Sequence, residues 1–212
     1  MPNYAHHTFE GGGIAIWHIT ETSDELYALL GMPCYDAQLL AKKNESRRAE
    51  WLAVRLLVKE LFGSECEVAY HPTGRPYLKN GVAHISISHT KGFAAVAYHH
   101  AAPIGMDIEY LSSRVERIAS RFTTQVEASY IDVHDEHARQ MYHLINWSAK
   151  EALYKLFDSP SLAEFKEAFH IAPYMLAECG AMEATVCSAE KSVLAVSYRT
   201  FPEFVCTWAN SQ

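Results

Sequence analysis

The longest pattern of apolar positions along the chain runs from about Tyr35 to Phe62. Leucines recur there at helical intervals and Gly63 supplies a stop, so the pattern predicts one long helix over residues 35–62. The other positions of this segment carry basic side chains, namely Lys42, Lys43, Arg47, Arg48, Arg55 and Lys59. Charges placed in this way usually mark a solvated helix face.

Shorter apolar segments in the first half of the chain have the pattern of strands. Residues 13–19 predict an opening strand, and a turn rich in proline and glycine occupies residues 72–76. Residues 83–88 and 93–98 alternate or run apolar on either side of the short connection 89–92. This arrangement predicts a β-hairpin.

The second half repeats the order of strand, helical region and strands after a break at Ala101–Pro103. Its predicted elements are a strand at 104–109, helices over about 112–157, and strands at 184–187, 193–198 and 204–208. The pattern therefore predicts an α+β fold with two subdomains of similar size, residues 1–102 and 103–212. Each subdomain is expected to pack a small antiparallel sheet against a long helix, as an internal duplication would.

Composition narrows the class of protein. A chain of 212 residues with 49% hydrophobic residues can bury a full core, but no apolar run is long enough to cross a bilayer. The net charge of -7 argues against nucleic-acid binding, and the five cysteines are scattered, without the spacing of a zinc site or a disulfide framework. We expect a cytoplasmic protein with neither a nucleic-acid nor a membrane partner.

The charge is distributed unevenly between the two predicted subdomains. Residues 1–102 hold 9 Lys and Arg against 10 Asp and Glu, whereas residues 103–212 hold 9 against 15. The first half is therefore the better candidate for binding an anion, and the second half for binding a metal ion.

Two carboxylates lie on one face of the strand predicted at 104–109, which has the sequence IGMDIE. Since successive side chains of a strand point to opposite faces, Asp107 and Glu109 should emerge together while the apolar residues enter the core. Neighbouring carboxylates repel unless a proton or cation joins them, and Mg²⁺ can do so. Gly105 would let another backbone or a ligand approach. The alternative is an exposed strand edge with two solvated acids.

A third carboxylate occurs in the helical segment 147–155, WSAKEALYK. Spacing of four places Trp147, Glu151 and Lys155 on one helix face. A Glu–Lys pair at this spacing usually only supports a helix. If the helix crosses the strand at 104–109, however, Glu151 would complete a magnesium site and Lys155 would meet phosphate oxygens.

Together these segments resemble the signature of the 4'-phosphopantetheinyl transferase superfamily. Two earlier segments agree with the resemblance: GRP at residues 74–76 is similar to that family's Gly-Lys-Pro turn, and ISISHT at 85–90 is similar to its strand ending in Ser-His. The similarity covers residues 45–157, with four motifs in the family's order. The long, two-halved chain resembles the pseudodimeric, Sfp-type class.

For the second half, the resemblance implies a magnesium-dependent site. Asp107, Glu109 and Glu151 match the family's magnesium ligands, with the ion bridging pyrophosphate oxygens of coenzyme A. Lys155 matches the lysine that contacts the phosphate and stabilises the departing 3',5'-ADP. Met106 stands where Val or Ile is common in the family, which keeps the apolar character of that position.

For the first half, the resemblance implies a grip on the nucleotide. Arg75, Ser88 and His89 match positions that hold the nucleotide of coenzyme A and its 3'-phosphate, and Arg48 or Arg47 adds to that grip. Guanidinium groups offer forked donors for phosphate oxygens, which suits this role. Arg75 replaces the more frequent lysine.

The resemblance further implies the reaction. The phosphopantetheine arm of coenzyme A moves to a serine of an apo acyl or peptidyl carrier protein, and no covalent enzyme intermediate is required. Glu127 aligns with the family's proposed general base, although Glu151 or a metal-bound water could serve instead. Because two fused halves would suffice, we expect a monomer.

Two alternatives to this function stay open at the level of the sequence. One is a non-catalytic relative that only binds coenzyme A or the carrier protein. The presence of all four of Asp107, Glu109, Glu151 and Lys155 argues against it, because pure binding has no need of a metal set. The other is a different magnesium-dependent phosphotransferase, but the chain shows neither a Walker-type nor a kinase-type phosphate loop.

Overall fold

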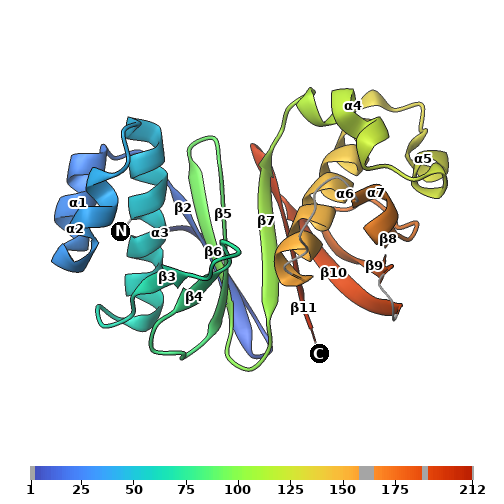
Figure 1. The fold of residues 1–212 in the computed structure, drawn as a ribbon. Coiled ribbons are helices and arrows are strands. Elements are labelled where there is room, and N and C mark those ends of the chain that lie inside the picture. Colours follow the sequence, from blue (N-terminus) through green and yellow to red (C-terminus); the bar gives the residue numbers. More distant parts are fainter. Residues whose placement is uncertain (1–2, 158–164, 188–190, 212) are drawn as a thin grey trace. The chain divides into compact units, whose positions relative to one another are not determined.

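The structure is a computed structural model that describes residues 3–157, 165–187 and 191–211. Helices and antiparallel sheets alternate along the chain, which confirms the predicted α+β class (Figure 1). The chain divides into two compact units, Met1–Pro103 and Ile104–Gln212. No helix in the described part of the chain is both long and apolar enough to cross a membrane.

Unit 1 contains a four-stranded antiparallel sheet in the order β1-β2-β6-β5. Its strands are β1 (Asn3–Phe9), β2 (Gly12–His18), β5 (His84–Thr90) and β6 (Phe93–His99), and a separate pair is formed by β3 (Val68–Tyr70) and β4 (Pro76–Leu78). The predicted hairpin and opening strand are thereby confirmed. Strand β1 was not predicted from the sequence. From residue 5 onward its side chains alternate only between half-buried and exposed, so the strand has no clear apolar face.

The helices of unit 1 are α1 (Ser23–Leu30), the 3₁₀ turn η1 (Pro33–Tyr35), α2 (Asp36–Leu40) and α3 (Glu45–Phe62). The single helix predicted over 35–62 is therefore wrong. Asn44 adopts an extended conformation and its side chain accepts a hydrogen bond from the Arg47 amide, so a new helix begins after it. Helix α3 packs on β6 and β2.

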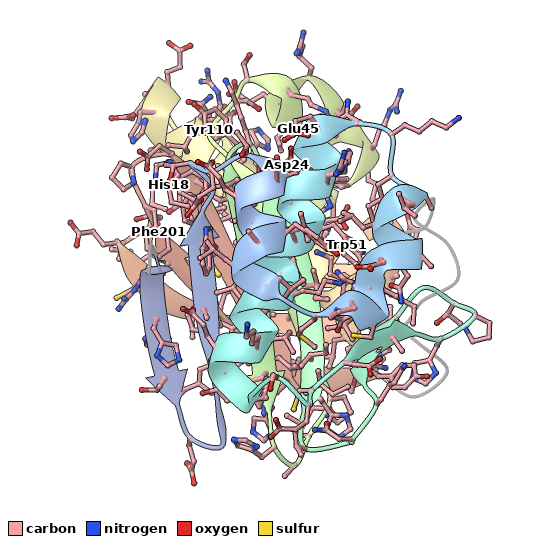
Figure 2. All side chains as sticks on the ribbon, turned by 90° about the vertical axis from the view of Figure 1, so that its left-hand side faces the viewer. His18, Asp24, Glu45, Trp51, Tyr110 and Phe201 are labelled. Atoms are coloured by element: carbon pink, nitrogen blue, oxygen red, sulfur yellow. The ribbon has the colours of Figure 1, made fainter. Side chains whose placement is uncertain are left out.

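The first residue of α1 is joined to the first residue of α3 by hydrogen bonds. Both the backbone amide and the hydroxyl of Ser23 donate to the Glu45 carboxylate at 2.8 Å. Figure 2 shows Asp24 and Glu45 at the same end of these two neighbouring helices. This contact fixes the first turn of α3, which carries Arg47 and Arg48.

Arg55 corrects the expectation that the basic residues of this helix are solvated. It is only 2% exposed, and its guanidinium lies 3.8 Å from the centre of the Trp51 ring. Its Nη2 donates to the Tyr70 hydroxyl at 3.1 Å, and its Cζ lies 5.5 Å from the centre of the Tyr35 ring. Arg55 therefore stabilises the core of unit 1 through cation–π contacts.

Unit 2 contains a five-stranded antiparallel sheet in the order β7-β11-β10-β9-β8. The strands are β7 (Ile104–Tyr110), β8 (Phe169–Ile171), β9 (Cys179–Val186), β10 (Ser192–Thr200) and β11 (Phe204–Asn210). The helical elements are α4 (Arg114–Ile118), η2 (Ala119–Arg121), α5 (Gln125–Ile131), α6 (Glu136–Phe157) and α7 (Phe165–Ala168). Helix α6 packs on β7 and β11.

The two units share one connectivity. In each, a strand leads to a long helix that packs on the sheet, and the last strand of the unit returns to pair with the strand that precedes the helices: β6 with β2, and β11 with β7. The last strand also pairs with the one before it, β5 or β10. This common core is compatible with the predicted duplication.

Candidate active site

The site predicted in the second half depends on how closely α6 approaches β7 (Figure 1). Gly105 makes this approach possible, because a Cβ atom at that position would lie 2.0 Å from the backbone oxygen of Ala152. No side chain can be accommodated at that distance. The missing side chain lets the backbone of α6 lie against β7, so the face that carries Asp107 and Glu109 is covered by the helix that carries Glu151 and Lys155.

Asp107 is buried under α6, with 6% of its surface exposed. Lys155 Nζ donates to its Oδ1 at 2.9 Å and to the Met106 carbonyl at 3.0 Å. Ser148 Oγ donates to its Oδ2 at 2.9 Å, and Thr207 of β11 contacts the Ser148 hydroxyl at the same distance. Contacts at both oxygens fix the plane of the carboxylate. Lys155, predicted to meet phosphate, thus lies beside one of the predicted metal ligands.

Glu109 and Glu151 are partly buried near Asp107. Trp147 Nε1 donates to Glu109 Oε2 at 3.1 Å, which tethers that carboxylate to α6. Burial, followed by repulsion from Asp107, raises the pKa of Glu109. The same two causes raise the pKa of Glu151 to about 7, with Lys155 acting in the opposite direction. The site therefore concentrates negative charge.

A magnesium ion suits the chemistry of these donors, since it prefers carboxylate oxygens and would relieve their repulsion. The ammonium of Lys155 forms an ion pair with Asp107, so this carboxylate already stabilises a positive charge. Nevertheless, no group of three or more His, Cys, Asp or Glu within residues 3–157, 165–187 and 191–211 is arranged to hold a metal ion. Asp107 nevertheless raises the pKa of both Glu109 and Glu151, so the three carboxylates are neighbours, and their side chains would have to turn toward a common point to bind one ion.

Glu127, a candidate for the general base, lies in a different environment. It is 1% exposed, and its carboxylate forms an ion pair with the fully buried Lys150 at 2.9 Å. It also accepts hydrogen bonds from the backbone amides of Thr124 at 2.7 Å and Ile171 at 2.8 Å. The contacts join α5, α6 and β8. This is the environment of a structural residue, and the geometry gives the general-base assignment no support.

In unit 1, Arg47 rather than Arg48 lies beside His89. Arg47 Nη1 is 3.4 Å from His89 Nε2 and donates to Glu50 Oε2 at 3.0 Å. Arg48 points instead toward Asp24, with 3.7 Å between Nη2 and Oδ1. Of the two arginines that the sequence left open, the structure therefore places Arg47 beside His89.

Ser88 and Arg75 occupy separate places in unit 1. Ser88 is buried in β5, next in sequence to the exposed His89. Arg75 lines a pocket of about 390 Å³ together with His71, Tyr77 and His84. A pocket that combines a guanidinium with aromatic and imidazole rings can hold a nucleotide base and a phosphate.

Three residues that contact predicted site residues, or contact their partners, were not singled out from the sequence. Ser148 and Lys150 lie within the segment 147–155, but nothing in its pattern reveals that one contacts Asp107 and the other Glu127. Thr207 gives no local signal at all. It lies opposite Asp107 in the pairing of β11 with β7.

Comparison with known proteins agrees with the chemistry of unit 2. Residues 103–207 match the family model of the 4'-phosphopantetheinyl transferase superfamily. The match contains both segments that carry the predicted magnesium ligands, while Arg47, Arg75 and His89 lie outside it. A search of curated proteins finds no match to this chain.

Proposed function

We propose that this chain, whose residues 103–207 form a domain of the 4'-phosphopantetheinyl transferase superfamily, transfers the phosphopantetheine arm of coenzyme A to a serine of an apo acyl or peptidyl carrier protein. The observation that carries the proposal is the cluster of Asp107, Glu109, Glu151 and Lys155 where α6 crosses β7. The common connectivity of the two units supports the two-halved, Sfp-type class.

In the proposed reaction, the serine hydroxyl oxygen forms a bond to the β-phosphorus of coenzyme A. The bond from that phosphorus to the bridging oxygen breaks, 3',5'-ADP leaves, and the serine proton passes to a base. Lys155 can hold the charge of the leaving phosphate, because its ammonium is only partly buried. Glu151 is the more accessible of the two candidate bases, since it is only partly buried whereas Glu127 is fully buried.

We further propose Asp107, Glu109 and Glu151 as the residues that hold Mg²⁺. When bound there, the ion neutralises charge on the pyrophosphate of coenzyme A. In this proposal Trp147 keeps Glu109 directed at the site through the hydrogen bond from its indole. Gly105 keeps the two acid-bearing elements in contact.

For the nucleotide, we propose the arginines of unit 1 and the groups beside them. Arg47, with His89 next to it, can neutralise a phosphate, and Arg75 with its pocket forms a second place for the nucleotide. Glu50 accepts a hydrogen bond from Arg47 and therefore limits the directions in which the guanidinium can point. Arg47 is assigned to this role in preference to Arg48, which faces Asp24.

The first test is the intact mass of the carrier protein. Incubation of the purified protein with Mg²⁺, coenzyme A and a panel of apo fatty-acid, polyketide and peptide carriers is expected to add one phosphopantetheine mass to at least one carrier. Glu151→Gln should abolish the addition, while Glu136→Gln, an exposed acid on the same helix, should not. Unmodified carriers across the panel would contradict the transferase function and leave the non-catalytic alternative.

A second test compares the two arginines of α3. Arg47→Met is expected to raise KM for coenzyme A about tenfold with little change in kcat, because one charge-assisted contact contributes roughly 1.5 kcal/mol. Arg48→Met should have a smaller effect, and Lys43→Met serves as the neutral control. Steady-state kinetics provide the measurement, and a larger effect from Arg48 than from Arg47 would refute the assignment.

A further inference from the structure

Two buried hydroxyl groups form a short chain of hydrogen bonds that ends on Asp107. Ser148 Oγ lies 2.9 Å from Asp107 Oδ2 and 2.9 Å from Thr207 Oγ1. Ser148 belongs to α6 and Thr207 to β11, so the chain joins the helix to the strand that pairs with β7. All three side chains lie inside unit 2, within or at the edge of the part that matches the superfamily.

The direction of the hydrogen bonds in this chain follows from the chemistry of its members. The Ser148 hydroxyl donates its proton to Asp107 Oδ2, because a carboxylate oxygen accepts hydrogen bonds. Ser148 has one hydroxyl proton, so the bond between the two hydroxyls must use the proton of Thr207. Thr207 therefore donates to Ser148, and Ser148 donates to Asp107.

The two hydroxyl groups of this hydrogen-bond chain are buried, so each of them needs a hydrogen-bond partner. Ser148 and Thr207 are both 0% exposed, and a buried hydroxyl is unfavourable unless it forms a hydrogen bond. Valine would fill the place of Thr207 with nearly the same shape and would need no partner. Because packing alone does not require a hydroxyl at this position, the Thr207 hydroxyl has a polar task, and its chain leads to Asp107.

Asp107 is the side chain that benefits from this orientation. Lys155 donates to Oδ1 and Ser148 donates to Oδ2, so a cation and a neutral donor both help to fix the carboxylate. If the neutral donor loses its own support from Thr207, Ser148 can rotate toward another acceptor. The Asp107 carboxylate can then turn further toward Lys155.

We propose that Thr207 is a positioning residue that acts through Ser148 to fix the orientation of the Asp107 carboxylate for binding a divalent cation. The inference rests on the proposed function, because that function assigns Asp107 to the ion. Partners behind a metal ligand commonly contribute about 10–100-fold to metal affinity. Thr207 is accordingly expected to affect Mg²⁺ binding without touching the substrate.

The test is the Kd for Mg²⁺, measured by calorimetric titration of the full chain in the absence of coenzyme A. Thr207→Val should weaken binding about tenfold, whereas Thr207→Ser, which keeps the hydroxyl, should bind nearly as the wild type does. Thr200→Val removes a threonine hydroxyl from β10, whose hydrogen bond goes to the Glu178 carbonyl, and serves as the matched control. It should leave the Kd unchanged.

Unchanged Mg²⁺ affinity in Thr207→Val overturns the inference, as does an equal loss in Thr207→Val and Thr207→Ser, since the hydroxyl would then be irrelevant. Ser148→Ala supplies a second variant that breaks the same chain, and it should weaken Mg²⁺ binding at least as much. Thermal unfolding without Mg²⁺ identifies any variant that fails to fold. Absence of binding by the wild type contradicts both the inference and the proposed magnesium site, whereas normal wild-type binding with an unaffected Thr207→Val contradicts the inference alone.

Discussion

Glu127→Gln is expected to lower the free energy of unfolding by about 3–5 kcal/mol, because it leaves the ammonium of Lys150 buried without its counter-charge. A second substitution, Lys150→Met, should recover most of this loss, since the pair is replaced by a neutral amide and an apolar side chain. Chemical denaturation of the two single variants and the double variant measures the coupling.

The activity of the same double variant separates the two roles considered for Glu127. If Glu127 is structural, the folded Glu127→Gln/Lys150→Met protein should transfer phosphopantetheine within a few-fold of the wild-type rate. If it is the general base, the rate should fall by about 10²–10⁴-fold even though the protein folds. A folded but inactive double variant would therefore restore the general-base assignment.

Stability of the single Glu127→Gln variant should also depend on pH. Burial lowers the pKa of Lys150, and Glu127 counteracts this in the wild type. Without Glu127 the folded-state pKa should fall further below the unfolded value. Since the unfolded state then binds more protons, stability should rise as the pH increases between these two pKa values. Stability of this variant that is independent of pH would contradict this account.

Glu151→Gln is expected to stabilise the protein in the absence of Mg²⁺, by up to about 3 kcal/mol at pH 8. The pKa of Glu151 is raised from 4.5 to about 7, and one pKa unit corresponds to about 1.4 kcal/mol. The folded state binds the proton more tightly than the unfolded state, so wild-type stability should decrease as the pH rises from 4.5 to 7. The variant lacks this decrease, and the two proteins should become equally stable near pH 4.5.

Thermal unfolding across this pH range, with Glu136→Gln as control, measures the effect. Mg²⁺ should raise the unfolding temperature of the wild type and reduce its difference in stability from Glu151→Gln, because a bound ion relieves the repulsion between the carboxylates. A variant less stable than the wild type at pH 8 would show that Glu151 is stabilised by its neighbours rather than repelled by them. That result would contradict the burial and repulsion that raise the pKa of Glu151 in the structure.

The sequence predicted the elements whose apolar pattern is long and regular. The hairpin of β5 and β6 and the strand β7 lie within a residue or two of the predicted limits. The prediction of one helix over residues 35–62 failed because Leu39 and Leu40 continue the helical spacing, although α2 ends at Leu40 and that side chain is 85% exposed. The capping signal of Asn44 was present in the sequence but outweighed by that spacing.

Only the residues of the candidate site that lie within the recognised sequence motifs could be predicted. Alternation along β7 correctly separated the carboxylates from the apolar residues, but it suggested that Asp107 emerges from the sheet, and Asp107 is buried. Gly105 held the clue, since it allows α6 to cover that face. Thr207 could not be found, because its link to Asp107 depends on how two strands far apart in the sequence align.

The position of a bound ion tests the central claim most directly. Mn²⁺ can replace Mg²⁺ at a carboxylate site and broadens NMR signals of nuclei near it. Substoichiometric Mn²⁺ is expected to broaden the backbone amide signals of Asp107, Glu109 and Glu151 before any others, and excess Mg²⁺ should reverse the effect. Broadening that begins elsewhere, or that spares either β7 or α6, would show that the acids of the strand and the helix do not share one divalent ion.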